Sequence, residues 1–484
     1  MTRPAYLLPA ALCAGCAMSL VLRASAVPLV ALVCVGALAR PHLAIALLLV
    51  AGGWWWGSER VRALDRSVLA AQIGTAEFAL VETQEPAHVT RFAVRVRVLV
   101  RRWGEMNVHE LAMLELPLGR APPQGSRLQV LGTLRDPSDV ERTRLRRHGV
   151  HVVLRASAFR VVGSRQSAAD RLHAWLVRAS VPGLVGERRA VLEGVVLGET
   201  QGLSEGLQQR FRASGLYHLL AVSGGNVLVV GGGTVVLVLA LGLSRLVAES
   251  FALLTIGGYV LAVGPQPSVL RAGMAGALGC LAWLTGRERD RWHALLLGAA
   301  ALLLWNPWTL LDPGFQLSFA AVGAIFVAAP RVRRWLDGYP LPRHAREPIA
   351  LSAVCGAATA PISWLHFHQI PLLTIPANVA AAPVVAPMLA LALLAALLPP
   401  LGPMLAHANG LLAAYLAGCA RFFGGLPGAQ VTSGAGAAAL AGGALLLAAY
   451  SGSKIGRRGE RAEAGLPADR KRPAEDRTRG APVA

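Results

Sequence analysis

Long apolar runs recur along this chain to about residue 450, and they constrain its fold more than any other feature. Three open the sequence, at about 5–22, 27–39 and 42–56. The chain is 54% hydrophobic and only 15% charged, whereas soluble domains carry about 25% charged residues. Because about 20 apolar residues can cross a bilayer, the pattern predicts a polytopic α-helical membrane protein. Later spans are expected at about 226–243, 247–263, 268–284, 292–305, 313–329, 348–363, 371–398, 404–423 and 433–450.

A different pattern interrupts these runs between residues 77 and 162. Apolar and polar residues alternate in FAVRVRVLV (92–100) and RLQVLGTL (127–134), and alternation with period two is typical of strands. Gly and Pro separate such segments, as in GRAPPQG (119–125). Short strands at this density predict a small all-β domain inserted between helices, with the OB-fold as the leading candidate.

Composition divides the chain into five regions. Leu172, Trp175 and Leu176 share one helical face, which is typical of an amphipathic helix at a membrane interface. Ser204 then has the position of an N-cap. The sequence after residue 453 is polar and charged, which predicts disorder. The expected regions are N-terminal transmembrane helices (1–56), an OB-like barrel (77–162), amphipathic interfacial helices (167–213), a polytopic domain (214–452) and a basic disordered tail (453–484).

Four local patterns receive structural interpretations. Arg3, the following apolar run and Ala24-Ser25-Ala26 resemble a signal peptide, but the next apolar run follows at once, so we expect a retained span. Cys13 and Cys16 are interpreted as small residues of that span. His366-Phe367-His368 lacks a carboxylate neighbour and is interpreted as an interfacial loop. Prolines at 371, 376, 383 and 387 predict a broken helix whose backbone is buried in protein or lines a cavity.

Basic residues predict the topology. The chain has 47 Lys and Arg against 27 Asp and Glu, a net charge of +20. The loops 285–292 and 330–347 are basic, as is the tail, and loops rich in Lys and Arg stay in the cytoplasm. The β-domain is then extracytoplasmic. If the short run 27–39 does not span, the N-terminus moves outside. Part of the positive charge is equally consistent with an anionic ligand.

Several polar residues lie at the ends of apolar runs, where they are costly unless they have a use. His218, Ser223 and Asn226 belong to GLYHLLAVSGGNVLVV (215–230). They line a polar path or form a turn in which Asn226 caps the next helix. Arg271 begins an apolar run and either contacts phosphates or snorkels to the interface. Asp312 has the position of an N-cap, and Gln316 and Asn378 need polar partners.

Three stretches resemble the ComEC competence family. They are VLGETQGLSEGLQQRFRASGLYHLLAVSGGNV (196–227), SVLRAG (268–273) with TGRERDRW (285–292), and NPWTLLDPGFQLSFAAVGAI (306–325). Two departures accompany them. Asn226 stands where the family has a second His, and Gly225 where it has a Leu. The sequence has no His-x-His-x-Asp-His motif, so we expect a form without the family's metallo-β-lactamase-like domain.

The resemblance implies an inner-membrane channel that carries single-stranded DNA into the cytoplasm during natural transformation. The residues expected along its path are His218, Ser223, Asn226, Arg271, Gln316 and Asn378. In the β-domain, the basic run 136–149 is either a solvated segment or a DNA contact. Its arginines are Arg142, Arg144, Arg146 and Arg147.

The expected partners are membrane lipid, a DNA receptor, a motor ATPase and a nuclease. No P-loop motif is present, so transport energy is expected from the motor or from a gradient. No enzymatic activity, cofactor or metal is expected. The alternative function is transport or scaffolding of another anionic polymer or envelope molecule by the same domain. Oligomeric state is left open.

Overall fold

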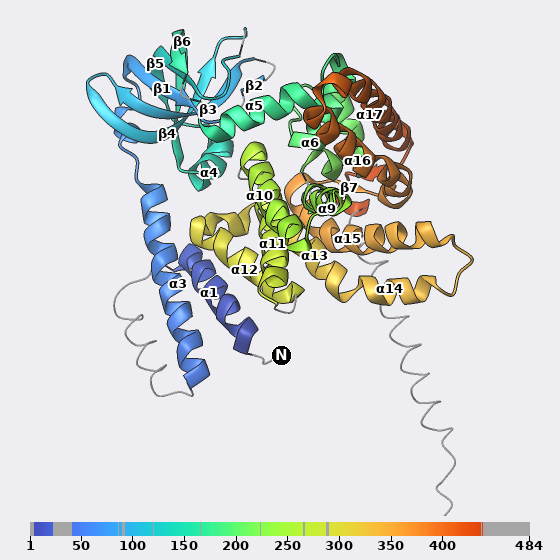
Figure 1. Ribbon diagram of the computed structural model, residues 1–484. Coiled ribbons are helices and arrows are strands. Elements are labelled where there is room, and N and C mark those ends of the chain that lie inside the picture. Colours follow the sequence, from blue (N-terminus) through green and yellow to red (C-terminus); the bar gives the residue numbers. More distant parts are fainter. Residues whose placement is uncertain are drawn as a thin grey trace, which may run out of the picture. The chain divides into compact units, whose positions relative to one another are not determined.

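A computed structural model describes residues 4–22, 41–85, 87–89, 92–119, 121–164, 166–222, 224–264, 267–286, 290–436 and 438. Residues Met1–Gln430 form one unit and Val431–Ala484 a second. The first unit contains a small β-barrel followed by a series of mostly apolar helices (Figure 1). The predicted short run 27–39 and the predicted tail lie outside the described residues.

The barrel consists of β1 (Ala76–Thr83), β3 (Val94–Trp103), β4 (Met106–Leu116), β5 (Ser126–Arg135) and β6 (Val150–Ser164). The strands pair in the cyclic order β1-β3-β4-β6-β5-β1, with β4 and β6 parallel and the other pairs antiparallel. β2 (His88–Val89) pairs antiparallel with the start of β3, and α4 (Asp139–Arg147) lies between β5 and β6 in the sequence. Strands β3 and β5 confirm the two alternating segments predicted at 92–100 and 127–134.

Alternation along each strand places its apolar residues inside the barrel. In β3, Val94, Val96, Val98 and Val100 are buried, while the arginines between them are not. Each strand contributes such a row to one apolar core. Hydrogen bonds attach the barrel to the short helix η1 (Leu69–Gln72) that precedes it. The Glu110 carboxylate accepts the Val68 and Leu69 N–H groups at 2.9 and 3.1 Å.

Two helices precede the barrel, α1 (Pro4–Val21) and α3 (Pro41–Asp65), with η1 (Leu69–Gln72) after them. They approach closely at glycines, since Gly15 lies against Val50 and Gly57 lies against Ser19. Because the residue numbers rise together along the contact, α1 and α3 run in the same direction. At its start, α1 meets the segment before α12, where Tyr6 donates a 2.5 Å hydrogen bond to Asp290.

A connecting group follows the barrel: α5 (Ala168–Ser180), α6 (Gly186–Leu197), α7 (Glu205–Ala213) and α8 (Tyr217–Leu220). The predicted N-cap of α7 is confirmed, because the Ser204 side chain accepts the Leu207 N–H. Leu192 and Phe211 are fully buried in a core that also includes residues of α16 and α17. α5 joins this core through Leu176, whereas Trp175 is exposed.

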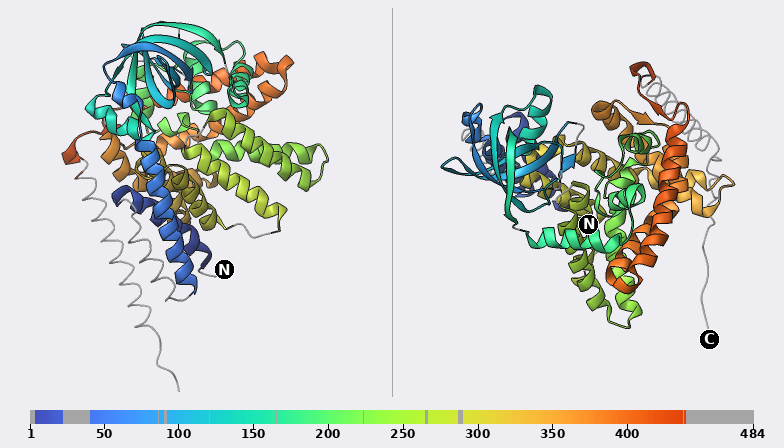
Figure 2. Two further views of the ribbon diagram at one scale, coloured as in Figure 1. Left: turned by 90° about the vertical axis from the view of Figure 1, so that its left-hand side faces the viewer. Right: turned by 90° about the horizontal axis from the view of Figure 1, so that it is seen from above.

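Apart from α14 (Ala329–Leu336), which lies in the predicted basic loop 330–347, the remaining helices agree with the apolar runs up to residue 425. Figure 2 shows α9 and α10 packed side by side. They are α9 (Gly224–Ala240), α10 (Arg245–Val263), α11 (Pro267–Leu284), α12 (Arg291–Trp305), α13 (Pro313–Val327), α14 (Ala329–Leu336), α15 (Arg343–Phe367), α16 (Thr374–Leu397) and α17 (Gly402–Gly425). Short elements between them are η2 (Pro307–Leu311), β7 (Ile370–Pro371), η3 (Pro399–Leu401) and β8 (Gln430–Val431).

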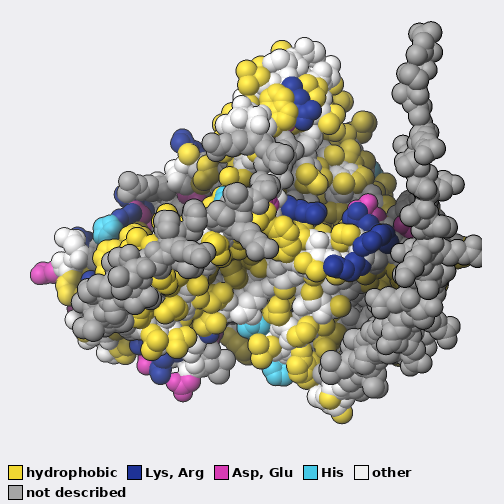
Figure 3. Space-filling view, turned by 90° about the horizontal axis from the view of Figure 1, so that it is seen from below, with side chains coloured by type: hydrophobic (Ala, Val, Ile, Leu, Met, Phe, Trp, Pro, Cys, Tyr) yellow, Lys and Arg dark blue, Asp and Glu magenta, His cyan; other side chains and the backbone are white. Residues whose placement is uncertain are grey.

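Several of these helices are suited to a bilayer. Among the described residues, three are long and apolar enough to cross one: Arg245–Val263, Ala345–Phe367 and Thr374–Leu397. α13 and α14 together form a fourth candidate, bent by 51°. Large apolar side chains such as Leu228, Val236 and Leu254 are exposed. Figure 3 shows a mostly apolar face on which basic side chains gather.

The predicted break in the run 371–398 is wrong, because α16 is a continuous helix from Thr374 to Leu397. Pro376 falls in the first turn, where the missing N–H has no helical partner to lose. Pro383 and Pro387 lie inside the helix. Side chains of α17 bond nearby carbonyls, since Tyr415 donates to Ala380 at 3.1 Å and Asn409 to Met388 at 2.8 Å.

Candidate nucleic-acid interface

The turn between α7 and α8 depends on a glycine with a left-handed backbone. Gly215 has φ +77°, and a Cβ there would lie 2.3 Å from the Thr374 hydroxyl oxygen, so only glycine fits. The exposed imidazole of His218 donates from Nδ1 to the Gly215 carbonyl at 2.8 Å. Its other nitrogen, Nε2, makes no hydrogen bond to the residues that the structure describes. Ser223 lies outside the described residues.

Asn226 has a structural environment rather than an open one. It is 3% exposed and its Nδ2 donates to the Val195 carbonyl at 2.6 Å. Tyr259 donates to the next carbonyl, that of Val196, also at 2.6 Å. Both carbonyls belong to the last turn of α6, where helical partners are lacking. Asn226 is therefore a residue of the first turn of α9 that holds the end of α6. The interpretation of Asn226 as an N-cap is wrong, because α9 already begins at Gly224.

Arg271 points into the helical unit. Its Cγ lies near Gly298 of α12, and its Nη2 lies near Gly224 at the start of α9. The guanidinium carbon is 5.8 Å from the centre of the Phe319 ring in α13. The Nη1 atom is buried and has no hydrogen-bond partner in the described part of the chain. A snorkelling Arg would place this atom in water, so the geometry favours a cation that lacks its anion.

Gln316 continues the polar group from Arg271 along α13. It lies three residues before Phe319 and therefore on the neighbouring turn of the same face. Its Nε2 donates to the Leu310 carbonyl at 3.0 Å, and its Oε1 accepts from His366 Nε2 at 2.8 Å. Asp312 accepts the Phe315 N–H, which confirms the predicted N-cap. Asn378 is half-buried on α16.

His366 is not among the residues that the sequence predicts for the DNA path. The predicted loop at 366–368 is wrong, because α15 continues to Phe367 and ends at His368, whose φ is +53°. Nothing near His366 in the sequence indicates its bond to Gln316, which is 50 positions away. Side chains of α11, α13 and α15 are thus linked in the order Arg271, Phe319, Gln316 and His366.

The four arginines after β5 have three different environments. They belong to the short helix α4. Arg142 pairs with Asp136 at 2.7 Å and Asp139 at 3.1 Å. Arg147 docks α4 onto η2, since Nη1 donates to the Leu311 carbonyl at 3.2 Å and Asn306 Nδ2 donates to the Arg147 carbonyl at 2.9 Å. Arg144 and Arg146 are exposed, and neither has an ion pair within the described residues.

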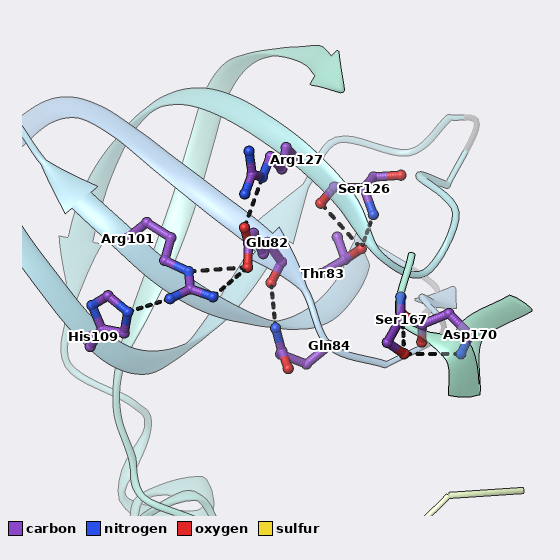
Figure 4. Close-up of polar contacts among 9 residues, drawn as sticks. All are labelled: Glu82, Thr83, Gln84, Arg101, His109, Ser126, Arg127, Ser167 and Asp170. Atoms are coloured by element: carbon purple, nitrogen blue, oxygen red, sulfur yellow. Dashed lines mark hydrogen bonds and ion pairs between the residues drawn. The ribbon is translucent and has the colours of Figure 1, made fainter. Parts of the chain in front are cut away.

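Acidic partners pair with three of the four arginines of β3. Arg95 pairs with Glu115 at 2.5 Å and also with Glu141, and Arg97 pairs with Glu85. Figure 4 shows Arg101 bonded to Glu82. The outward face of β3 and β4 is consequently a poor site for a polyanion.

Glu82 is the centre of a polar cluster that also contains Arg101, Arg127 and His109. Its carboxylate accepts from Arg101 Nε and Nη2 at 3.0 and 2.8 Å and from Arg127 Nε at 2.8 Å (Figure 4). Arg101 also contacts His109. Burial alone would raise the pKa of Glu82, but the hydrogen bonds and charges of Arg101 and Arg127 outweigh it and lower the pKa. The cluster joins β1, β3 and β5 on the outside of the barrel.

His173 is a second residue that the sequence interpretation missed. Nδ1 donates to the Ala262 carbonyl at 2.7 Å, and Nε2 contacts the Glu199 carboxylate at 2.9 Å. Both partners only accept, so both ring nitrogens must carry protons. Burial lowers the pKa of His173, but these two bonds and the Glu199 charge raise it on balance. The imidazolium ties α5 to the end of α10.

Comparison with known proteins identifies the family. The model of the family described as "Competence protein" matches residues 195–458. The match covers more than half of the chain. The chain belongs to the competence protein family. The matched region begins in the last turns of α6 and includes the Arg271 group.

Three relatives show how far the similarity extends. The chain is 28% identical over 194 residues to "ComE operon protein 3" of Bacillus subtilis, covering 40% of this chain and 24% of that protein. It is 30% identical over 253 residues to "Competence protein ComA" of Neisseria gonorrhoeae, covering 49% and 34%. It is 28% identical over 218 residues to "Uncharacterized protein YcaI" of Escherichia coli, covering 40% and 27%. Each match therefore spans about a third or less of the relative. No solved structure matches.

Proposed function

We propose that this competence-family protein is a multi-pass protein of the bacterial inner membrane that passes single-stranded DNA into the cytoplasm during natural transformation. The observation that carries the proposal is Arg271, a guanidinium inside an apolar group of helices with a buried nitrogen that has no hydrogen-bond partner among the described residues. A phosphate would complete its hydrogen bonds. The description of the family and the name of the Neisseria relative, which both refer to competence, support DNA as the source of that phosphate.

Membrane insertion is supported by the helices and by their direction. α10, α15 and α16 are long and apolar enough to span, and α9 and α10 expose large apolar side chains such as Leu228, Val236 and Leu254. Because α1 and α3 run in the same direction, residues 22 and 41 lie at opposite ends of this pair. This supports two crossings in the same sense, with the N-terminus in the cytoplasm beside the basic segment that precedes α12.

We assign the barrel to the OB class and to the outer side of the membrane. A five-stranded Greek-key barrel is the architecture of that class, and the pairing order agrees with it. Arg144 and Arg146 are the α4 cations free to attract DNA before it reaches the helices. The polymer then passes His218 and the group from Arg271 to His366, with Asn378 on the neighbouring α16, while Asn226 supports this region through α6.

The proposal assigns no chemical step to this chain. Among the described residues, no group of three or more His, Cys, Asp or Glu side chains is arranged to hold a metal ion. Transport therefore needs only cations, polar groups that replace water and a gap through the bilayer. A separate motor, DNA receptor and nuclease would supply force, capture and strand removal.

Deleting the gene and measuring nuclease-resistant import of labelled DNA tests the proposal. We expect import to disappear and to return when the intact gene is supplied on a plasmid. The matched control measures DNA bound at the cell surface, which should persist because a separate receptor binds it. Unchanged import would overturn the proposal. An unchanged import together with altered envelope polymers would identify another anionic polymer as the cargo.

A further inference from the structure

One outward face of the barrel carries apolar side chains between unpaired cations. In β1, Phe78 lies directly opposite Leu131 of β5, which lies opposite Ala158 of β6. Residues opposite each other in a sheet share a side, and their strand neighbours Ala79 and Val130 are buried inside the barrel. Phe78 and Leu131 therefore point outward, and they are 56% and 37% exposed.

The neighbouring rows place cations around this apolar centre. Leu80 lies between Arg102 of β3 and Gln129 of β5, and Gln129 lies opposite Arg160 of β6. On the other side, Arg155 lies opposite Thr133. We call this surface the β1–β5–β6 face and define it by Phe78, Leu80, Arg102, Leu131, Arg155 and Arg160.

The cations of the β1–β5–β6 face differ in their ion pairing from the other arginines of β3, which are Arg95, Arg97 and Arg101. Arg102, Arg155 and Arg160 are exposed, and none has an ion pair with any residue that the structure describes. Glu77 directly precedes Phe78 in β1, so its side chain leaves the strand on the opposite side. The arginines on the β3–β4 side are occupied by carboxylates. This face thus presents free positive charge together with an exposed aromatic ring.

The dimensions suit a nucleic-acid strand. Three strand-to-strand steps separate Arg102 from Arg160, so their backbones lie about 14 Å apart across the barrel surface. The Phe78 row lies two residues away, about 7 Å along the strands. Bases stack on aromatic rings without sequence preference, and guanidiniums hold phosphates. A protein interface, in contrast, usually excludes charge from its centre and needs a larger area.

We propose that the β1–β5–β6 face binds single-stranded DNA, with a base on Phe78 and phosphates on Arg102 and Arg160. The proposal rests on the proposed function, which makes DNA the cargo. It locates the main contact of the barrel on its strands instead of on α4. It also assigns the ion-paired arginines of β3 to stability rather than to binding.

Fluorescence anisotropy with a labelled single-stranded oligonucleotide tests the proposal on the full-length protein in detergent. We expect Phe78→Ala to weaken binding about tenfold, within the range for loss of one stacked base. Arg160→Gln should weaken it severalfold and reduce the salt dependence by about one phosphate contact. Matched controls are Phe92→Ala, another exposed phenylalanine of the barrel, and the charge-neutral double variant Arg97→Gln/Glu85→Gln. Both should bind as the wild type does.

The outcomes distinguish this proposal from the proposed function. Full binding by Phe78→Ala and Arg160→Gln, with loss in Arg144→Ala/Arg146→Ala, would overturn the β1–β5–β6 face and leave DNA as the cargo. No binding by the wild type would contradict both. A photoreactive benzoylphenylalanine at position 78 gives a second readout that needs no truncation. It should crosslink the oligonucleotide, whereas the same group at position 92 should not. Crosslinks between protein copies would make the face a protein interface.

Discussion

Arg271 allows a test in which function and stability move apart. Its buried Nη1 lacks a partner, and an unsatisfied buried donor costs about 1–3 kcal/mol. The contact with Phe319 offsets about 0.5–2 kcal/mol of this. Replacing Arg271 by Met, which has similar length and no polar head, removes both effects. We therefore expect Arg271→Met to change the free energy of unfolding by no more than about 1 kcal/mol, on the stabilising side.

The import of labelled DNA, unlike the stability, should fall when the charge at position 271 is removed. Arg271→Lys keeps a point charge and should import partially, whereas Arg271→Gln keeps none and should import little. Import is normalised to the amount of protein in the membrane, and thermal unfolding is followed in detergent by tryptophan fluorescence. The matched control is Arg245→Gln, because Arg245 lies in an apolar helix but is paired with Glu249 at 3.3 Å. It should import normally.

Two results would refute this reasoning. Wild-type import by Arg271→Gln would remove the residue from the path and shift attention to His218 and Gln316. A Tm of Arg271→Met several degrees below that of the wild type would show that the guanidinium stabilises the fold. Its unpaired nitrogen would then not indicate an absent phosphate.

Three further predictions concern stability and topology. Glu82→Gln should lower the local stability of the barrel by about 2 kcal/mol, a value already reduced because the partner arginines are partly exposed. Hydrogen exchange of the barrel strands should therefore accelerate about 30-fold. The control variant Glu77→Gln, at an exposed carboxylate, should not alter the exchange rate. The protonated His173 should stabilise fully below about pH 6.5 and lose this effect as pH rises through its raised pKa; an identical pH dependence of Tm in His173→Gln would contradict this. In a cysteine-free background, Glu105→Cys should react with an impermeant thiol reagent from outside, and Tyr339→Cys only after the cells are opened; the reverse pattern would invert the topology.

Elements set by local pattern were predictable from the sequence. The alternating valines of β3 are buried because period two places them on one side of a strand. Ser204 and Asp312 cap helices because their oxygens reach N–H groups only three residues ahead. Apart from α14, the helices from α9 to α17 follow the apolar runs. In all these cases the deciding interaction lies within a few residues of the pattern.

Interactions between distant residues were not predictable. The prolines of α16 suggested a break, but the helix is continuous and is bonded to α17, where Tyr415 donates to the Ala380 carbonyl 35 positions away. Asn226 resembled a helix cap until α6 placed the Val195 carbonyl against it. Within the candidate site, the cation Arg271 was identifiable, whereas its neighbour Phe319 and the Gln316–His366 bond required the packing of separate helices.

The hydrogen bonds of the barrel extend past its strands, and this limits how the domain can be exchanged between proteins. His151 donates to the Leu64 carbonyl at 2.7 Å, and Glu110 holds the Val68 N–H. A graft cut at 77–162 severs both connections and leaves the two side chains without acceptor or donor. Chimeras joined before Leu64 keep them. Among homologues, recombination that preserves a working barrel should therefore carry the end of the preceding helix with it, so the unit of inheritance is larger than the β-domain.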